Sequence, residues 1–240
     1  MIAGPFSSQP LGSEQDGRKA LLMTDRGYTP AAGRDWLLPF YDLFAKLLGV
    51  ERSHRRLLEQ AAIQSGYNVL EIGCGTGNLT ILAKRLHASA RVHGIDPDPK
   101  ALSRARRKAH RADLDVDFRQ AFSEQLPFQD ASCDRVLSAF MLHHIQSDTK
   151  VPALREVYRV LKPSGSLHLA DFEDVAGSRG HHTVSVAHQH EESRFRSTIS
   201  HLLQEAGFAD AKQVFNQANV LGDIGYFSAV RPPLAHATAA

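Results

Sequence analysis

The residues of this chain that could perform chemistry gather around a glycine-rich turn and an acid that follows it. Glycines alternate with other residues in Gly73-Cys74-Gly75-Thr76-Gly77, directly after the apolar run Val69–Ile72. Glycine lets a chain turn sharply out of a strand and lets a ligand approach the backbone closely. Asp96, 19 residues beyond Gly77, ends the next apolar run and can accept hydrogen bonds from both hydroxyls of a ribose. Together these features predict a site for a cofactor that contains a nucleoside.

The carboxylate of Glu71, two residues before the first glycine, indicates the charge of that cofactor. A negative group suits a ligand with positive charge, such as a sulfonium with an amino group, better than a pyrophosphate. The spacing G-x-G-x-G also differs from the dinucleotide fingerprint G-x-G-x-x-G, because Asn78 stands where the third glycine would fall. The alternative is that Glu71 hydrogen-bonds nearby backbone and the glycines only form a turn.

Two adjacent histidines, His143 and His144, are the candidates for a general base. They follow the apolar run 134–140, and the strand ends of an open α/β sheet border its ligand crevice. Imidazole titrates near neutral pH and often takes a proton in catalysis. The alternative for each histidine is a structural role, in which it caps the next helix or packs in the loop.

Two other charged or histidine-rich segments do not indicate a site. His181, His182, His188 and His190 lie in a polar stretch without a compact metal-binding spacing, so we expect a solvated loop and no metal site. The basic run 104–111 is followed by three aspartates, which is typical of a solvated helix face. The net charge of +2 gives no global basic field, so we do not expect nucleic acid as a substrate.

The elements that must position these residues alternate between strands and helices. The expected strands are 68–72, 91–95, 116–120, 134–140 and 166–171, and the expected helices are 77–87, 98–110, 148–161 and 194–206. Two last strands, 211–215 and 226–230, are close enough in sequence to pair antiparallel. Repeated βα units imply a parallel sheet with helices on both faces. The sequence therefore predicts a Rossmann-like α/β fold with a seven-stranded, mostly parallel sheet.

The chain divides by composition into a leader, a helical cap, one main domain and a tail. We expect a flexible leader over 1–27, an N-terminal helical cap over 28–65, a cofactor-binding domain over 66–232 and a flexible tail over 233–240. The cap has apolar residues at helical spacing in 36–48 and again in 51–62. Phe40, Tyr41 and Phe44 are candidates for an apolar wall of a substrate pocket, or they simply cover an edge of the sheet.

Length, hydrophobic content and the number of cysteines limit the class of protein. The 240 residues, 42% of them hydrophobic, suffice for one substantial core. No apolar run approaches the roughly 20 residues that a transmembrane helix needs, and the first residues do not have the pattern of a signal peptide. Cys74 and Cys133 are the two cysteines and no motif pairs them, so we expect a reducing cytoplasm rather than a disulfide framework.

The ordered set of motifs resembles a known family. Residues 69–80 are similar to motif I of the class I S-adenosylmethionine-dependent methyltransferases, in the group that includes the ubiquinone/menaquinone biosynthesis methyltransferases. Further segments that resemble this family follow in order at 94–96, 123–128, 134–145, 154–165 and 203–208. The resemblance covers about residues 67–230. It implies S-adenosylmethionine as the cofactor and methyl transfer to an oxygen, nitrogen, carbon or sulfur of a small molecule. An NAD-dependent oxidoreductase and a non-catalytic cofactor-binding protein are the alternatives.

The resemblance also implies which residues contact the cofactor. Gly73, Gly75 and Gly77 would line its methionine and ribose side, Asp96 would hold the ribose, Pro97 would pack on adenine, Ser138 and Ala139 would face the methionine portion, and Glu71, Cys74 and Ser123 complete the set. The chain departs from the family at Phe122, where an acid often bonds the adenine amino group. We expect adenine to lie against the Phe122 ring instead.

Overall fold

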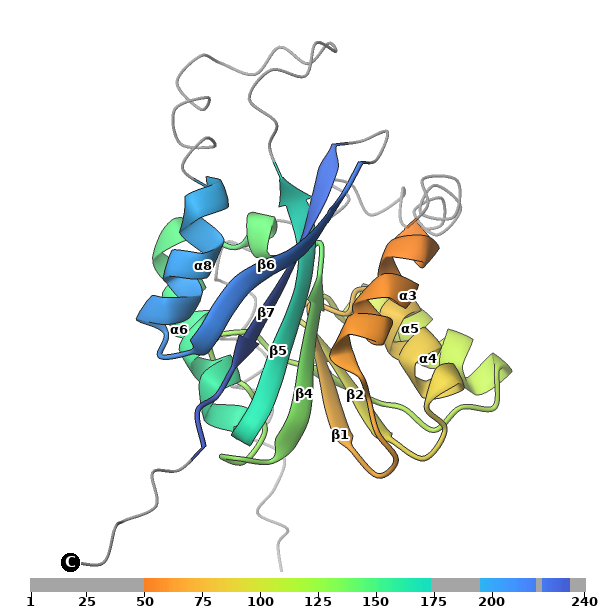
Figure 1. The fold of residues 1–240 in the computed structure, drawn as a ribbon. Helices are drawn as coiled ribbons and strands as arrows, with labels where there is room; N and C mark the ends of the chain where they lie inside the picture. Colours follow the sequence, from red (N-terminus) through yellow and green to blue (C-terminus); the bar gives the residue numbers. More distant parts are fainter. Residues whose placement is uncertain (1–49, 174–194, 219–221, 234–240) are drawn as a thin grey trace, which may run out of the picture.

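A computed structural model describes residues 50–173, 195–218 and 222–233 of the chain. The expected leader, the expected helix over 36–48 with Phe40, Tyr41 and Phe44, the histidines at 181–190 and residues 234–240 of the expected tail lie outside the described residues. The described part forms a sheet between two layers of helices (Figure 1).

The sheet has seven strands, as the sequence predicted, and their order is β3-β2-β1-β4-β5-β7-β6. The strands are β1 (Asn68–Ile72), β2 (Arg91–Asp96), β3 (Asp117–Gln120), β4 (Cys133–Ala139), β5 (Leu161–Glu173), β6 (Ala209–Gln217) and β7 (Asp223–Val230). Strands β1 to β5 are parallel, and β7 lies antiparallel between β5 and β6. Because β1 lies at the centre of the parallel part, its carboxyl end is flanked by those of β2 and β4.

Helices cover both faces of this sheet (Figure 1). The first layer contains α3 (Val50–Ala61), α4 (Asn78–Leu86) and α5 (Pro99–Arg111), and the second contains α6 (Ser147–Val160) and α8 (Phe195–Glu205). A short 3-10 helix, η2 (Leu142–His144), links β4 to α6. Gly207 follows α8 with φ of 99°, the conformation predicted for the end of this helix. Across the described ranges, no helix has both the length and the apolar character required to cross a bilayer.

Local sequence explains where α5 begins. The Asp98 carboxylate accepts the Lys100 backbone N–H at 2.8 Å, and Pro99 occupies the first helical turn, where its missing N–H costs no hydrogen bond. The buried face of α5 is built mainly from alanine and leucine, including Ala105. The helix can therefore lie close to β2 and β3 and hold the end of β2 in place.

Strand β5 is longer than the sequence predicted, because its partner β7 extends the ladder. The expected strand covered 166–171, whereas β5 pairs with β7 from Ser166 opposite Val230 to Glu173 opposite Asp223. The strand also begins earlier, where Leu161 pairs with Cys133 of β4. Alternation along β5 alone did not reveal these additional pairs. Asp171, the last residue of the expected strand, lies at the same end of the sheet as the glycine turn.

Candidate cofactor and acceptor site

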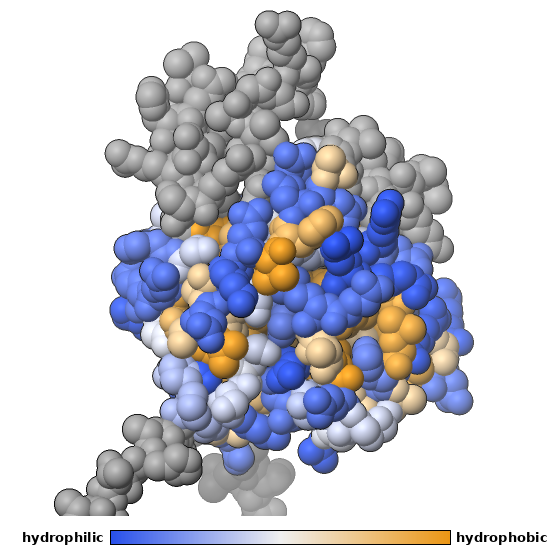
Figure 2. Space-filling model, viewed as in Figure 1, coloured by the Kyte–Doolittle hydropathy of each residue, from blue (hydrophilic) through white to orange (hydrophobic). Residues whose placement is uncertain are grey.

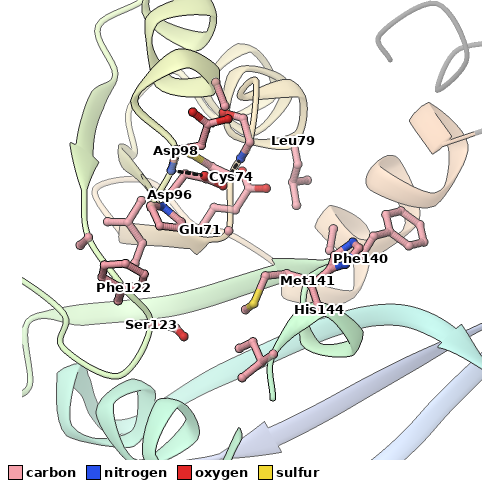
Figure 3. A pocket seen from close by; sticks show the side chains of 18 of the residues that line it. Glu71, Cys74, Leu79, Asp96, Asp98, Phe122, Ser123, Phe140, Met141 and His144 are labelled. Carbon is pink, nitrogen blue, oxygen red and sulfur yellow. Dashed lines mark hydrogen bonds between the residues drawn. The ribbon is translucent and has the colours of Figure 1, made fainter. Parts of the chain in front are cut away.

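A cavity of about 510 Å³ lies at the carboxyl ends of β1, β2 and β4 (Figure 3). This is the edge at which open α/β sheets bind their ligands. Nine of the predicted cofactor residues line it: Glu71, Gly73, Cys74, Gly75, Asp96, Pro97, Phe122, Ser123 and Ala139. In Figure 3 the acids Asp96 and Asp98 lie on one side of the cavity, and Met141 and His144 lie across from them. The site therefore has two distinct walls.

The glycine turn shapes the first wall. Gly73 and Gly75 have φ of 67° and 51°, in the left-handed region that favours glycine. A Cβ on Gly73 would collide with the side chain of Met141, so this glycine allows two segments to pack closely. A Cβ on Gly75 would meet nothing within 4 Å. The space beside Gly75 belongs to the cavity, and the missing side chain leaves the backbone accessible to a ligand.

Asp96 connects the end of β2 to this turn. One of its oxygens accepts the Gly75 N–H at 2.8 Å, and the other accepts the Asp98 N–H at 2.9 Å. Each carboxylate oxygen can accept a further hydrogen bond, so both hydroxyls of a ribose still have partners. Burial raises the pKa of Asp96 to about 6, although the two backbone N–H groups lower it in part. Asp96 thus also fixes the position of the turn, a role that the sequence did not indicate.

Glu71 is almost fully buried beneath the same turn. Its side chain accepts a hydrogen bond from the Thr80 hydroxyl of α4. Burial raises the pKa of Glu71 to about 8, while the hydrogen bond to Thr80 lowers it and nearby Asp96 raises it further. A buried carboxyl with a raised pKa gains stability when a cation is brought close to it. The site is therefore favourable to positive charge.

The charges around the cavity agree with this preference. The described lining residues include four acids, Glu71, Asp96, Asp98 and Glu124, and neither a lysine nor an arginine. A sulfonium and an ammonium group can form ion pairs with these acids when they ionise, whereas the pyrophosphate of a dinucleotide cannot. The negative lining supports the cofactor inferred from Glu71 and the glycine spacing and disfavours the NAD alternative.

The structure separates the two predicted catalytic histidines. His144 lines the cavity, whereas His143 is not among the lining residues. His143 Nδ1 lies 2.5 Å from a carboxylate oxygen of Asp171, and the backbone N–H of His143 donates to the other oxygen at 3.3 Å. Asp171 is fully buried at the end of β5. Burial, and to a smaller degree the neighbouring His143, lowers the pKa of His144.

Two other predicted residues lie behind the cavity wall. Gly77 packs against α5, since a Cβ there would lie 2.9 Å from that of Ala105. Ser138 is fully buried in β4, and its hydroxyl has no hydrogen-bond partner in the described part of the chain. Both residues support the cavity from beneath, and neither lines it.

Among the site residues that sequence reasoning missed are two buried polar ones, His54 and Asp171. His54 of α3 lines the cavity, is 8% exposed, and has its pKa lowered to about 4 by burial. It lies on the buried face of α3 with Leu57, Leu58 and Ala61, at spacings of three, four and seven residues. That periodicity could have identified His54. Asp171 was the last residue of the strand expected over 166–171, so its place at the carboxyl edge of the sheet could have identified it too.

Comparisons with known proteins agree with this geometry. Residues 69–165 match a family described as a methyltransferase domain. A demethylmenaquinone methyltransferase from Thermus thermophilus is 37% identical over 139 residues, which are 57% of this chain and 62% of that protein. The ubiquinone/menaquinone biosynthesis C-methyltransferase UbiE from Pseudoalteromonas translucida is 31% identical over 173 residues, 70% of this chain and 68% of that protein.

A solved structure shows the same fold. The phosphoethanolamine N-methyltransferase 2 of Haemonchus contortus, in complex with S-adenosyl-L-methionine, superposes with a TM-score of 0.59 at 19% identity, over 75% of this chain and 52% of that chain. The match to the Thermus relative spans a little less than two thirds of that protein's length. By the extent and identity of the Pseudoalteromonas match and by its fold, the chain belongs to the class I S-adenosylmethionine-dependent methyltransferases, in the group of the ubiquinone/menaquinone biosynthesis enzymes.

Proposed function

We propose that the chain transfers the methyl group of S-adenosylmethionine to a small molecule bound between the glycine turn and His144. The observation that carries this proposal is the acidic lining of the cavity, which combines four acids with no lysine or arginine among its described residues. A cationic cofactor relieves the burial of Glu71 and Asp96, and an anionic cofactor does not. When bound, the cofactor supplies an activated methyl group on sulfur.

The residues of the first wall fit this cofactor in a defined order. Gly75 leaves space for close approach, and Asp96 offers free lone pairs to a ribose. Pro97 and Phe122 present apolar surface on the side where adenine would lie. Glu71 lies beneath the turn and would stabilise the positive charge of the methionine portion. Gly77 and Ser138 hold these residues in place from behind.

The second wall suits a flat, mainly apolar acceptor. Phe140, Met141 and Ile145 line it beside the imidazole of His144. Relatives of this chain are named as demethylmenaquinone methyltransferases. We therefore propose an aromatic acceptor of the quinol class, with a ring carbon or a hydroxyl oxygen as the nucleophile. The cap residues Phe40, Tyr41 and Phe44 stay proposed contributors to the same wall.

His144 is proposed as the general base and His143 as a positioning residue. In methyl transfer the acceptor atom attacks the methyl carbon, the bond to sulfur breaks, and the acceptor loses one proton. His144 lines the cavity, and its lowered pKa keeps the ring neutral and able to take that proton. His143 holds the turn through Asp171, and its ring lies 4.0 Å from that of His144 between centroids. Asp171 thereby fixes the position of His144 through its neighbour.

The experiment compares His144→Asn with His143→Asn in cofactor binding and in turnover of a reduced quinone. We expect His144→Asn to lower turnover by about 10²–10⁴-fold with little change in cofactor affinity, and to remove the rise of activity with pH. His143→Asn should lower turnover less and keep that rise. Wild-type turnover in His144→Asn would contradict the base, and binding of NAD without S-adenosylmethionine would contradict the function. Cofactor binding without transfer to any acceptor would favour the non-catalytic alternative.

Two broader expectations belong to the same proposal. We propose that residues 66–232 form the catalytic domain and residues 28–65 a cap over the acceptor, with 1–27 and 233–240 outside both. We also propose a cytoplasmic location, because Cys74 and Cys133 are both free thiols. Limited proteolysis of the full chain would test the domain boundaries, and fractionation of cells that express it would test the location.

A further inference from the structure

A second hollow, of about 520 Å³, adjoins the cofactor cavity on the outer side of α3, α4 and α5. The two hollows share three lining residues, Val50, His54 and Asn78. Four cationic side chains line the second hollow, namely Arg55, Arg85, Lys108 and Arg111, with Glu51 as its single acid. Glu51 is itself engaged by Arg55 at 2.9 Å. We call this hollow the basic groove.

The helices beside the groove extend its positive charge. Helix α4 contains two basic residues and α5 contains six lysines and arginines, and neither helix contains an acid. Arg85, Arg107 and Arg111 are exposed. This density of charge within two adjacent helices contrasts with the net charge of +2 for the whole chain. These two helices therefore carry a local excess of positive charge.

The groove also exposes apolar side chains among these cations. Leu86 is 50% exposed, directly after Arg85, and Ile81 and Leu82 line the groove one turn earlier. Figure 2 shows apolar patches within hydrophilic surface on the side of the molecule where these helices lie in Figure 1. On a basic face that only contacts water, an exposed leucine would contribute no favourable contact. Basic and apolar side chains together are typical of surfaces that bind the interface of an anionic bilayer.

We propose that this face of α3, α4 and α5 docks on an anionic lipid surface, with phospholipid headgroups in the basic groove and Leu86 against the acyl boundary. Lys108 connects the groove to the cofactor turn, because its Nζ contacts the Thr76 hydroxyl at 3.0 Å and the Asn78 side-chain oxygen at 2.6 Å. Docking would place a lipid-soluble acceptor next to the site that methylates it. The docking itself does not depend on the proposed acceptor.

The acids that follow α5 do not cancel this charge. Asp117 is engaged by Arg119 at 2.7 Å and by His93 at 3.1 Å. Asp113 and Asp115 are exposed, but neither lines the basic groove. Between exposed side chains, the attraction of opposite charges is weakened by solvent. The groove keeps its excess of positive charge.

The test is sedimentation of the full chain with vesicles of phosphatidylglycerol and phosphatidylcholine, without cofactor or acceptor. We expect binding that weakens with salt and is absent from vesicles of phosphatidylcholine alone. Each basic residue near a charged surface contributes about 1 kcal/mol, which is roughly fivefold. Arg85→Gln with Arg111→Gln should therefore weaken binding roughly 25-fold. Leu86→Ser should weaken it further.

The matched control is Arg155→Gln with Lys212→Gln, which removes the same charge from exposed residues on α6 and β6. The control should bind vesicles like the wild-type chain. If both double variants lost vesicle binding equally, binding would depend on the total charge of the chain, and the proposed role of the groove would be overturned. Failure of the wild-type chain to sediment at low salt would overturn the docking. Preferential binding of duplex DNA or of inorganic phosphate, lost in the groove variant, would do the same. None of these results would affect the proposed methyl transfer.

Discussion

The cofactor cavity and the basic groove share a wall at His54 but have opposite charges. The cavity has four acids and no lysine or arginine among its described lining residues, whereas the groove has four cations and one acid. Helix α4 lies between them: Thr80 contacts Glu71 of the cavity, and Arg85 faces the groove. The net charge of the chain is near zero, yet acids gather in the cavity and cations gather in the groove. The cavity therefore favours a cationic ligand, and the groove favours an anionic one. Local charge, rather than the total, indicates what each region binds.

The largest effect expected from this comparison is on stability at Glu71. Its folded-state pKa of about 8 lies above the ordinary glutamate pKa of 4.5, so the folded chain holds a proton that the unfolded chain releases. Stability from this group is present below pH 4.5 and is lost as pH rises toward 8. Glu71→Gln, which stays neutral, should stabilise the cofactor-free protein by roughly 4 kcal/mol at pH 8 and by less than about 1 kcal/mol at pH 5. Urea unfolding at the two pH values measures the difference.

Glu51→Gln is the control for that experiment, because Glu51 lies exposed in the basic groove beside Arg55. Its substitution should change stability little at either pH, as expected for an exposed ion pair. The same stabilisation in both variants would show that general charge, rather than burial in the cavity, is responsible. No gain for Glu71→Gln at pH 8 would contradict the raised pKa.

The next effect is on cofactor binding through Asp96. Asp96→Ala removes an acceptor for the ribose hydroxyls and the hydrogen bonds to Gly75 and Asp98, so affinity for S-adenosylhomocysteine should fall by about 1–3 kcal/mol in calorimetry. Arg85→Gln in the groove should leave this affinity unchanged. Asp96→Asn keeps one acceptor oxygen, so its affinity for S-adenosylhomocysteine should lie between those of Asp96→Ala and the parent chain. Parent-like binding by Asp96→Ala would remove Asp96 from the cofactor site.

A third, smaller effect is the pH dependence of S-adenosylmethionine binding. The cation favours ionised Glu71, so below pH 8 binding must release the proton that Glu71 holds in the free protein. Affinity should fall by at most about tenfold per pH unit from pH 8 toward pH 6. Calorimetry in two buffers with different ionisation enthalpies measures the released proton. Glu71→Gln should remove both the slope and the proton release, and an unchanged slope would assign the dependence to another group.

The two walls of the cavity also differ in how far the sequence predicted them. The first wall is local: one strand, one turn and one helix carry Glu71, Gly75 and their neighbours, and a single acid, Asp96, arrives from the next strand. Such spacing can be read along the chain. The second wall depends on pairing between distant strands. Asp171 stood at the end of the strand expected over 166–171, but its contact with His143 joins two segments 28 residues apart, and no spacing along the chain indicates that contact.

For the fold, too, the sequence predicted local features better than features set by distant contacts. The alternation of strands and helices predicted the parallel part of the sheet and the antiparallel pair at its end, because each element has its own periodicity. Boundaries set by tertiary contacts were missed, such as the start of β5 at Leu161 opposite Cys133. His54 is intermediate: its periodicity placed it on the buried face of α3, but the sequence did not indicate that two hollows meet there.

The smallest predicted effect tests the acidity of the cavity at Phe122, the position where the resemblance to the family predicts an acid. Phe122 and Ser123 line the cavity (Figure 3), on the side proposed for adenine. Phe122→Ala should raise the dissociation constant of S-adenosylhomocysteine several-fold, since apolar contact of part of a ring contributes about 1 kcal/mol. Phe122→Asp should restore most of the affinity, because a carboxylate there can accept a hydrogen bond from the adenine amino group.

A fifth acid should not weaken a cavity that favours cations, so weaker binding by Phe122→Asp than by Phe122→Ala would contradict that preference on the adenine side. Parent-like binding by both variants would place adenine elsewhere. The control is Phe215→Ala on the edge strand β6, which removes an exposed ring outside both hollows and should leave cofactor binding unchanged.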